Sequence, residues 1–99
     1  MKHFVLVTNR TTAEQDKAFF TILRARFSHL GWWHQLSETW LFVDLMDTTT
    51  AEQLRNAAME AFPTVFLVVL EITGQHTWAG FGPTESMFKW IRETWDRSN

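Results

Sequence analysis

The chain of 99 residues contains no cysteine, which excludes a disulfide framework, a thiolate metal site and a cysteine nucleophile. Long apolar runs are absent too. The longest, Val65–Leu70, is far too short to span a membrane, and Phe4–Val7 is too short for a secretory signal and lacks a cleavage site of small residues. No repeat or linker divides the sequence. These absences predict a soluble, cytoplasmic protein that forms one domain over residues 1–99.

A strong charge of either sign is also missing, because nine lysines and arginines stand against eleven aspartates and glutamates, for a net charge of −2. Binding to nucleic acid would therefore need a local basic patch. The candidates are interleaved with acids or separated by turns, so solvated helix faces are the simpler interpretation. They are Lys17, Arg24, Arg26, Lys89, Arg92 and Arg97. Nucleic acid is left open as a partner, but the charge does not favour it.

Signatures of catalysis are sparse. No serine lies in a nucleophile-elbow context, and no glycine-rich phosphate loop is present. The four histidines, His3, His29, His34 and His76, show no metal-ligand spacing, since none has another histidine three or four residues away. We expect structural or surface roles for them, with His34 as the first choice if one is functional.

Aromatic residues are abundant, with nine phenylalanines and six tryptophans in a chain that is 45% hydrophobic. A domain of this length can bury a core of its own. The remaining large apolar side chains indicate a second buried surface, and hence association with another molecule.

The first half of the chain alternates strand and helix signals. His3–Thr8 is typical of a strand, and a helix is expected to start at Thr11 or Thr12, because each has a capping-box partner three residues later. Gly31 fits the end of that helix. Two strands then follow, Trp32–Leu36 and Thr39–Leu45, which the turn Ser37-Glu38 joins into a hairpin.

The second half repeats the pattern. Thr49 and Thr50 both have capping-box partners, and Pro63 would end the helix that they begin. Val65–Ile72 is the fourth strand. The order β-α-β-β-α-β predicts an α+β fold of the ferredoxin-like kind, an antiparallel sheet with two helices on one face. The core covers about residues 1–73, and a C-terminal extension over about 74–99 ends in a helix from Thr84 that places apolar residues on one side.

Both faces of the sheet carry apolar residues. In the third strand we expect Leu41 and Val43 to face the helices, and Trp40 and Phe42 to point to the open face. The terminal helix could cover part of the open face and a second subunit the rest. The sequence therefore predicts a homodimer through the open sheet face, with Trp40 at its centre and Trp90 as a second interface candidate.

The stretches WWHQLSETW (32–40) and TGQHTWAGF (73–81) resemble a family of small bacterial proteins labelled SinR-like. This family is related in fold to the dimeric nuclease subunit of CRISPR spacer acquisition. The resemblance spans most of the chain and implies a ferredoxin-like domain that dimerises through its sheet. The CRISPR-associated relatives carry an aspartate at the end of the first strand, which is proposed to hold a divalent metal. Here the corresponding residue is Asn9, and an amide is a weaker ligand that compensates no charge.

The leading hypothesis is a non-catalytic homodimeric module for binding or assembly, in a defence or toxin–antitoxin system, with an unknown protein partner and no metal or cofactor. It assigns no catalytic residue. The expected binding residues are Asn9, His34, Ser37, Thr39, Trp40, Phe42 and Trp78.

The alternative is an endonuclease that cleaves RNA or DNA with Mg²⁺ or Mn²⁺. Its only clustered carboxylates would be Asp44, Asp47 and Glu71, for which ordinary solvation at strand ends is the simpler interpretation. Asp44 shares a strand face with Trp40, so near the expected interface it would need a basic partner. An aromatic face of Trp40, Phe42 and Phe66 could also stack RNA bases, but the slight acidic excess favours core or dimer packing.

Overall fold

The computed structural model describes residues 1–82 and 84–96 of the chain. Strands and helices follow in the order β-α-β-β-α-β, and a helical segment lies near the C-terminus. The bounds are β1 Lys2–Thr8, α1 Ala13–Arg26, β2 Leu30–Leu36, β3 Thr39–Asp44, α2 Ala51–Ala61, β4 Leu67–Ile72, η1 Glu85–Phe88 and η2 Ile91–Trp95. We call residues 85–95 the terminal helical segment. The predicted α+β class and order of elements are confirmed.

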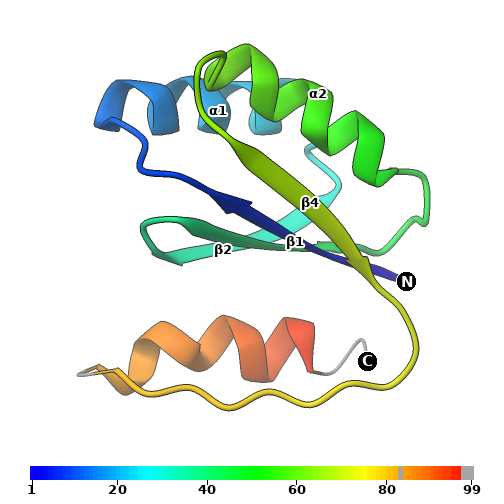
Figure 1. The fold of residues 1–99 in the computed structure, drawn as a ribbon. Coiled ribbons are helices and arrows are strands. Elements are labelled where there is room, and N and C mark those ends of the chain that lie inside the picture. The colour runs from blue at the N-terminus through cyan, green and yellow to red at the C-terminus, as the bar shows by residue number, and fades with distance from the viewer. Residues whose placement is uncertain (83, 97–99) are drawn as a thin grey trace.

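The four strands form one antiparallel sheet in the order β2-β3-β1-β4. The two strands that flank each α-helix are therefore separated by a strand from the other half of the chain. Helices α1 and α2 lie together on one face, and the terminal helical segment lies on the other, which makes three layers (Figure 1). Within residues 1–82 and 84–96, no helix has the length and apolar character that crossing a membrane requires.

Both α-helices begin at a capping box. The Thr12 hydroxyl accepts the Gln15 N–H at 3.1 Å, and the Gln15 side chain accepts the Thr12 N–H at 2.9 Å. Thr50 and Gln53 repeat this exchange at the start of α2. Of the two overlapping threonines predicted at each start, the second is the cap in both cases.

The predicted end of the first helix at Gly31 is wrong. α1 ends at Arg26, and the Phe27 N–H makes the last helical bond to the Leu23 carbonyl. Gly31 lies inside β2. A Cβ atom there would stand 3.4 Å from the Trp90 ring, so the glycine permits the terminal helical segment to pack closely on the sheet.

The largest core lies between the sheet and the two α-helices. Phe4 and Leu6 of β1 and Trp40 and Phe42 of β3 are completely buried there. The Phe19 ring of α1 packs edge-on against Trp40, with centroids 4.9 Å apart. Other buried members of this core include Leu23, Leu30, Leu54, Ala58 and Phe62.

The expected orientation of β3 is therefore the reverse of the one observed. Trp40 and Phe42 face the helices, whereas Leu41 and Val43 face the other layer. Both alternating sets are apolar, so the pattern of hydrophobicity did not distinguish the faces. The two aromatic rings occupy the space between the sheet and α1, and they leave no surface for a partner.

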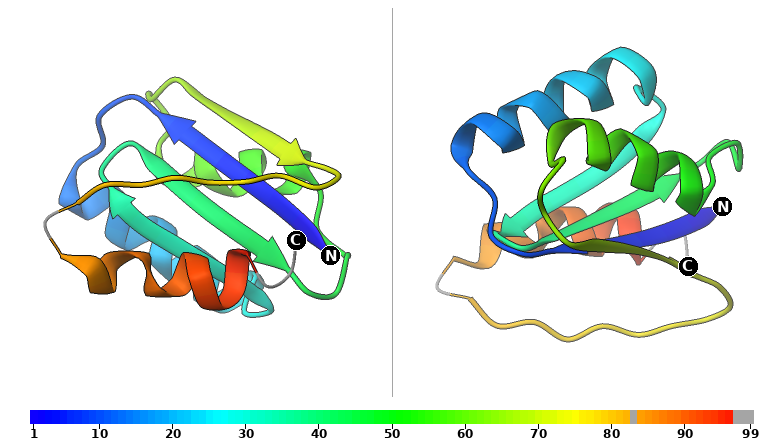
Figure 2. Two further views of the ribbon diagram at one scale, coloured as in Figure 1. Left: turned by 90° about the horizontal axis from the view of Figure 1, so that it is seen from below. Right: turned by 45° about the horizontal axis from the view of Figure 1, so that its top comes forward.

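The second layer covers only part of the other sheet face. Trp33 and Val43 pack against Ile91 and Trp95 of the terminal helical segment. The Trp33 indole N–H donates to the Met87 carbonyl at 2.6 Å. Seen from below, this segment lies beside β2 and β3, and the chain after β4 crosses beneath the strands to reach it (Figure 2).

Candidate interaction surface and polar clusters

The hairpin histidine, His34, is held on three sides. Its Nδ1 lies 2.9 Å from the Thr39 carbonyl oxygen and must donate, because that oxygen only accepts. Its Nε2 lies 3.5 Å from an Asp16 carboxylate oxygen, and the ring stacks on Trp40. Asp16 also accepts the Thr11 hydroxyl at 2.6 Å.

This arrangement fastens the hairpin to the start of α1. Both nitrogens of His34 already face oxygen atoms of the protein, and the side chain is only 10% exposed. These contacts pack the hairpin against α1.

The other predicted binding residues do not converge on one site. Ser37 is exposed in the hairpin turn, and Thr39 is half-buried beside His34. Asn9 is exposed at the end of β1, where its N–H donates to the Phe66 carbonyl. Trp78 stacks with Phe88 in the second layer. The remaining two, Trp40 and Phe42, are completely buried.

Asp44 is not solvated at the strand end but completely buried, and it organises the loop that precedes α2. Its carboxylate accepts the backbone N–H groups of Met46, Thr48 and Thr49 at 2.7–2.9 Å. Burial works to raise the pKa of the Asp44 carboxyl, but these N–H donors and the Thr49 hydroxyl outweigh it, so the pKa is lowered. The expected basic partner of this carboxylate is replaced by backbone donors.

Asp44, Asp47 and Glu71, the carboxylates of the nuclease alternative, have different surroundings. Asp47 has a positive φ of 54° in the same loop, and its carboxylate pairs with the Met1 amino group at 3.0 Å. Glu71 is exposed on β4. In the described part of the chain, no three histidine or carboxylate side chains are grouped as a metal would require.

A polar pocket of about 380 Å³ lies between the end of α1 and α2. The His29 Nε2 lies 2.8 Å from the Thr49 hydroxyl at its wall, and Arg26 pairs with Glu60 at 2.5 Å across it. The Asp44 oxygen is 3.9 Å from the same His29 nitrogen. A catalytic triad needs the carboxylate on the other ring nitrogen, so this group does not form one.

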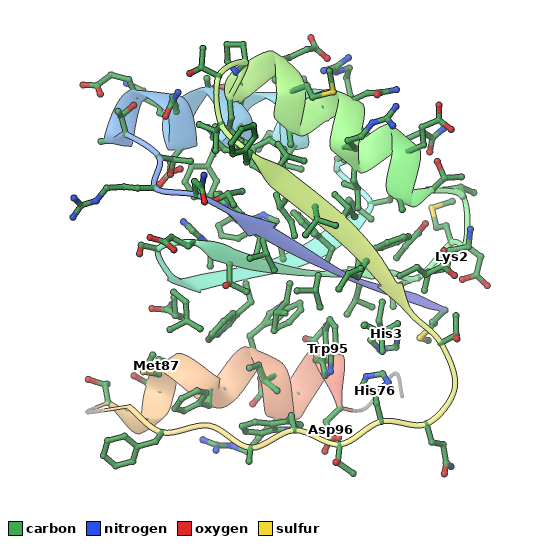
Figure 3. All side chains as sticks on the ribbon, viewed as in Figure 1. Lys2, His3, His76, Met87, Trp95 and Asp96 are labelled. Atoms are coloured by element: carbon green, nitrogen blue, oxygen red, sulfur yellow. The ribbon has the colours of Figure 1, made fainter. Side chains whose placement is uncertain are left out.

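A second cluster joins distant parts of the chain, and sequence analysis did not find it. His3, His76 and Trp95 meet where the end of the terminal helical segment approaches β1 (Figure 3). The His3 ring packs edge-on against both His76 and Trp95, at 4.8 and 4.7 Å, and its Nε2 lies 3.2 Å from the Trp95 carbonyl oxygen. Burial lowers the pKa of His3.

The uncovered part of the sheet presents a row of exposed apolar side chains. We call Val7, Phe66, Val68 and Leu70 the β4 patch. Phe66 is 83% exposed, while Val68 and Leu70 are 49% and 50% exposed. Val68 and Leu70 alternate along β4 and so share one sheet face, beside Val7 of β1. Phe66 directly precedes the strand and lines a shallow pocket with Val7 and Val68. Contiguous apolar surface of this kind marks interaction sites on soluble proteins.

β4 is also an edge strand, because the sheet order gives it β1 as its only neighbour. A groove of about 290 Å³ runs along its free edge and is bounded by Arg55 and Glu52 of α2. The strand contains no lysine or proline, the residues that often protect edges from pairing. The β4 patch and this edge together form the candidate interaction surface.

The chain matches no family model, no curated protein and no solved structure.

Proposed function

We propose that the protein is a homodimeric module for binding or assembly that acts in the cytoplasm, in a defence or toxin–antitoxin system, without catalytic residues, metal or cofactor. In this proposal a second copy docks at β4. A further protein partner is then recruited by the dimer.

The observation that supports a dimer is the uneven covering of the sheet. Trp33 and Val43 are buried beneath the terminal helical segment, whereas Val68 and Leu70 stay exposed on the same face and Phe66 stays exposed just before β4. Burial of apolar surface is worth roughly 25 cal/mol per Å². The exposed side chains therefore favour contact with another protein surface.

The strand order supports the ferredoxin-like part of the proposal. In the split β-α-β arrangement, each strand-helix-strand unit encloses a strand from the other unit, and the order β2-β3-β1-β4 has this property. The resemblance to the SinR-like family, which this proposal adopts, rests on residues 32–40 and 73–81. The first of these stretches forms the hairpin that His34 and Trp40 anchor to α1.

Light scattering at micromolar concentration tests the dimer. We expect a mass near twice 11.7 kDa for the wild type. Val68→Lys should shift the protein toward the monomer, because it places a charge in the contact surface. Leu36→Lys is a matched control, since Leu36 is 53% exposed but lies at the opposite edge of the sheet. A wild type of 11.7 kDa at every concentration would contradict the proposal.

A cleavage assay tests the absence of catalysis. Wild-type protein is incubated with labelled single- and double-stranded RNA and DNA in Mg²⁺ and in Mn²⁺, beside the Asn9→Asp variant. We expect no cleavage by the wild type. Metal-dependent cleavage in proportion to the wild-type protein would refute the non-catalytic assignment, and cleavage by Asn9→Asp alone would show that the amide is what prevents it.

A further inference from the structure

We infer that the second copy pairs antiparallel with the free edge of β4, with the two Val69 residues opposite each other on the two-fold axis. This inference rests on the proposed dimer and specifies its geometry. The two sheets become one continuous sheet of eight strands. The direction of the backbone hydrogen-bonding groups permits this register, and the pairing of the outward residues, the side-chain matching and the charges favour it.

Two hydrogen bonds show which residues of β4 direct their backbone N–H and C=O groups toward β1. The Asn9 N–H donates to the Phe66 carbonyl at 3.0 Å, so the backbone of Phe66 points toward β1. The Thr8 N–H donates to Glu38 instead, away from β4. Direction alternates along an antiparallel strand. Val68, Leu70 and Ile72 therefore also direct their backbone groups toward β1, while Leu67, Val69 and Glu71 direct theirs to the free edge.

A two-fold axis can pass through an outward residue or through an inward one such as Val68 or Leu70. An axis at Val68 or Leu70 leaves an outward residue, Glu71 or Leu67, opposite a residue outside β4. Of the three outward residues, only one suits the axis. An axis at Leu67 pairs half of the strand with the loop before it. An axis at Glu71 sets two like charges against each other, which destabilises a strand pair. An axis at Val69 pairs the whole strand, and the outward N–H and C=O groups of Leu67, Val69 and Glu71 all gain partners.

This register also matches the side chains on the open face. Val68 lies opposite Leu70 of the second copy, and Phe66 lies opposite Ile72 of the second copy. Directly opposed side chains in an antiparallel pair are about 5 Å apart and remove each other's flanks from water. Phe66, Val68 and Leu70 of the β4 patch thus each meet an apolar residue of the second copy.

On the helix-covered face of the sheet, the pairing brings the Glu71 carboxylate of the second copy to the groove beside α2. Glu71 of the second copy lies opposite Leu67, a wall residue of this groove. Arg55 lines the same groove, 50% exposed and 3.6 Å from Glu52. The carboxylate of the second copy would share the Arg55 guanidinium with Glu52. The pairing therefore brings an acidic residue to the basic one at each end of the interface.

The absence of native cysteine permits a direct test of the register. Val68→Cys and Leu70→Cys proteins, one with an affinity tag, are mixed in equal amounts, mildly oxidised and separated without reductant. The two positions are opposite each other at about 4.5 Å between Cα atoms, within reach of a disulfide. Like positions are diagonal at about 7–8 Å, beyond that reach.

We expect the mixture to yield the tagged–untagged covalent dimer, and each variant alone to yield little. Two outcomes overturn the inference. If light scattering shows a dimer but the mixture crosslinks no better than the single variants, the edge pairing is wrong and the proposed dimeric function stands. If the wild type is a monomer throughout, the proposed function fails and this inference fails with it.

An exchange of charges between two exposed residues, Arg55 and Glu71, provides a second test. Arg55→Glu and Glu71→Arg should each weaken the dimer by about threefold or more, and the double variant should recover most of that loss. Single variants that weaken the dimer without recovery in the double variant would place the two charges apart and contradict the register.

Discussion

The imidazole of His34 lies almost parallel to the indole of Trp40, with ring centroids 3.6 Å apart and an angle of 8° between the planes. Together with the contacts to Thr39 and Asp16, this stack connects the hairpin to α1. His34→Ala should lower the free energy of unfolding by about 1–3 kcal/mol, because it removes a ring contact and a hydrogen bond. Urea denaturation measures the loss.

The same variant separates stability from association. His34 lies on the helix side of the sheet, away from the β4 patch. We expect His34→Ala to keep the wild-type mass in light scattering at a concentration where it is folded. A variant of unchanged stability with altered association would return His34 to the interaction surface.

Trp40 is a core residue in this structure, and its substitution should affect folding. Trp40→Ala is expected to cost about 3–5 kcal/mol, because it leaves a cavity beneath Phe19 and Phe20. Trp32→Ala is the comparison, since Trp32 is 39% exposed on the same side of the sheet. It should cost clearly less in thermal or urea unfolding. Equal losses would mean that Trp40 is not the central residue of the core.

Asp44 should determine part of the acid sensitivity. Its folded pKa lies below the ordinary value of 3.8, so its stabilising effect is complete above that value and is lost as the pH falls through the folded pKa. Asp44→Asn should cost about 2–3 kcal/mol at neutral pH. Between about pH 5 and pH 2, its unfolding free energy should depend less on pH than that of the wild type.

Asp47→Asn is the matched control for this change. The Asp47 carboxylate is 54% exposed and pairs with an exposed amino group, an interaction worth at most about 1 kcal/mol. A loss at Asp44→Asn no larger than at Asp47→Asn would show that the three backbone donors do not depend on the buried charge.

His3 should make stability depend on pH in a higher range. Its folded pKa is lowered from 6.5, so the unfolded chain takes up the proton first as the pH falls. The contribution is complete above 6.5 and is lost as the pH falls toward the folded pKa. His3→Phe keeps a ring against Trp95 and should flatten the unfolding free energy between about pH 8 and pH 5. An unchanged slope would contradict this role.

Local signals in the sequence predicted the secondary structure well. The capping boxes at Thr12 and Thr50 and the turn at Ser37-Glu38 depend on neighbouring residues only, and the structure has all three. The end of α1 was placed at Gly31 because glycine often ends helices. The chain instead leaves the helix at Phe27, and the glycine serves packing against Trp90.

Features that depend on the whole fold were less accessible. The two faces of β3 are both apolar, so only the position of α1 decides that Trp40 lies inside. The roles of His3 and Trp95 depend on residues far apart in sequence. Asp44 did have a local signal, because aspartate side chains often accept the backbone N–H two residues later in a turn, as Asp44 does from Met46.

The terminal helical segment is held on the sheet by contacts that form last during synthesis. The bond from Trp33 to Met87 spans 54 positions, and the contact of His3 with Trp95 spans 92. Chains emerge from the ribosome from the N-terminus onward. A nascent chain that ends after β4 contains all residues of the helix-side core. Its Trp33 and Val43 are still exposed, because Ile91 and Trp95, which cover them, are missing. That sheet face is what a chaperone or a protease would encounter on an incomplete chain.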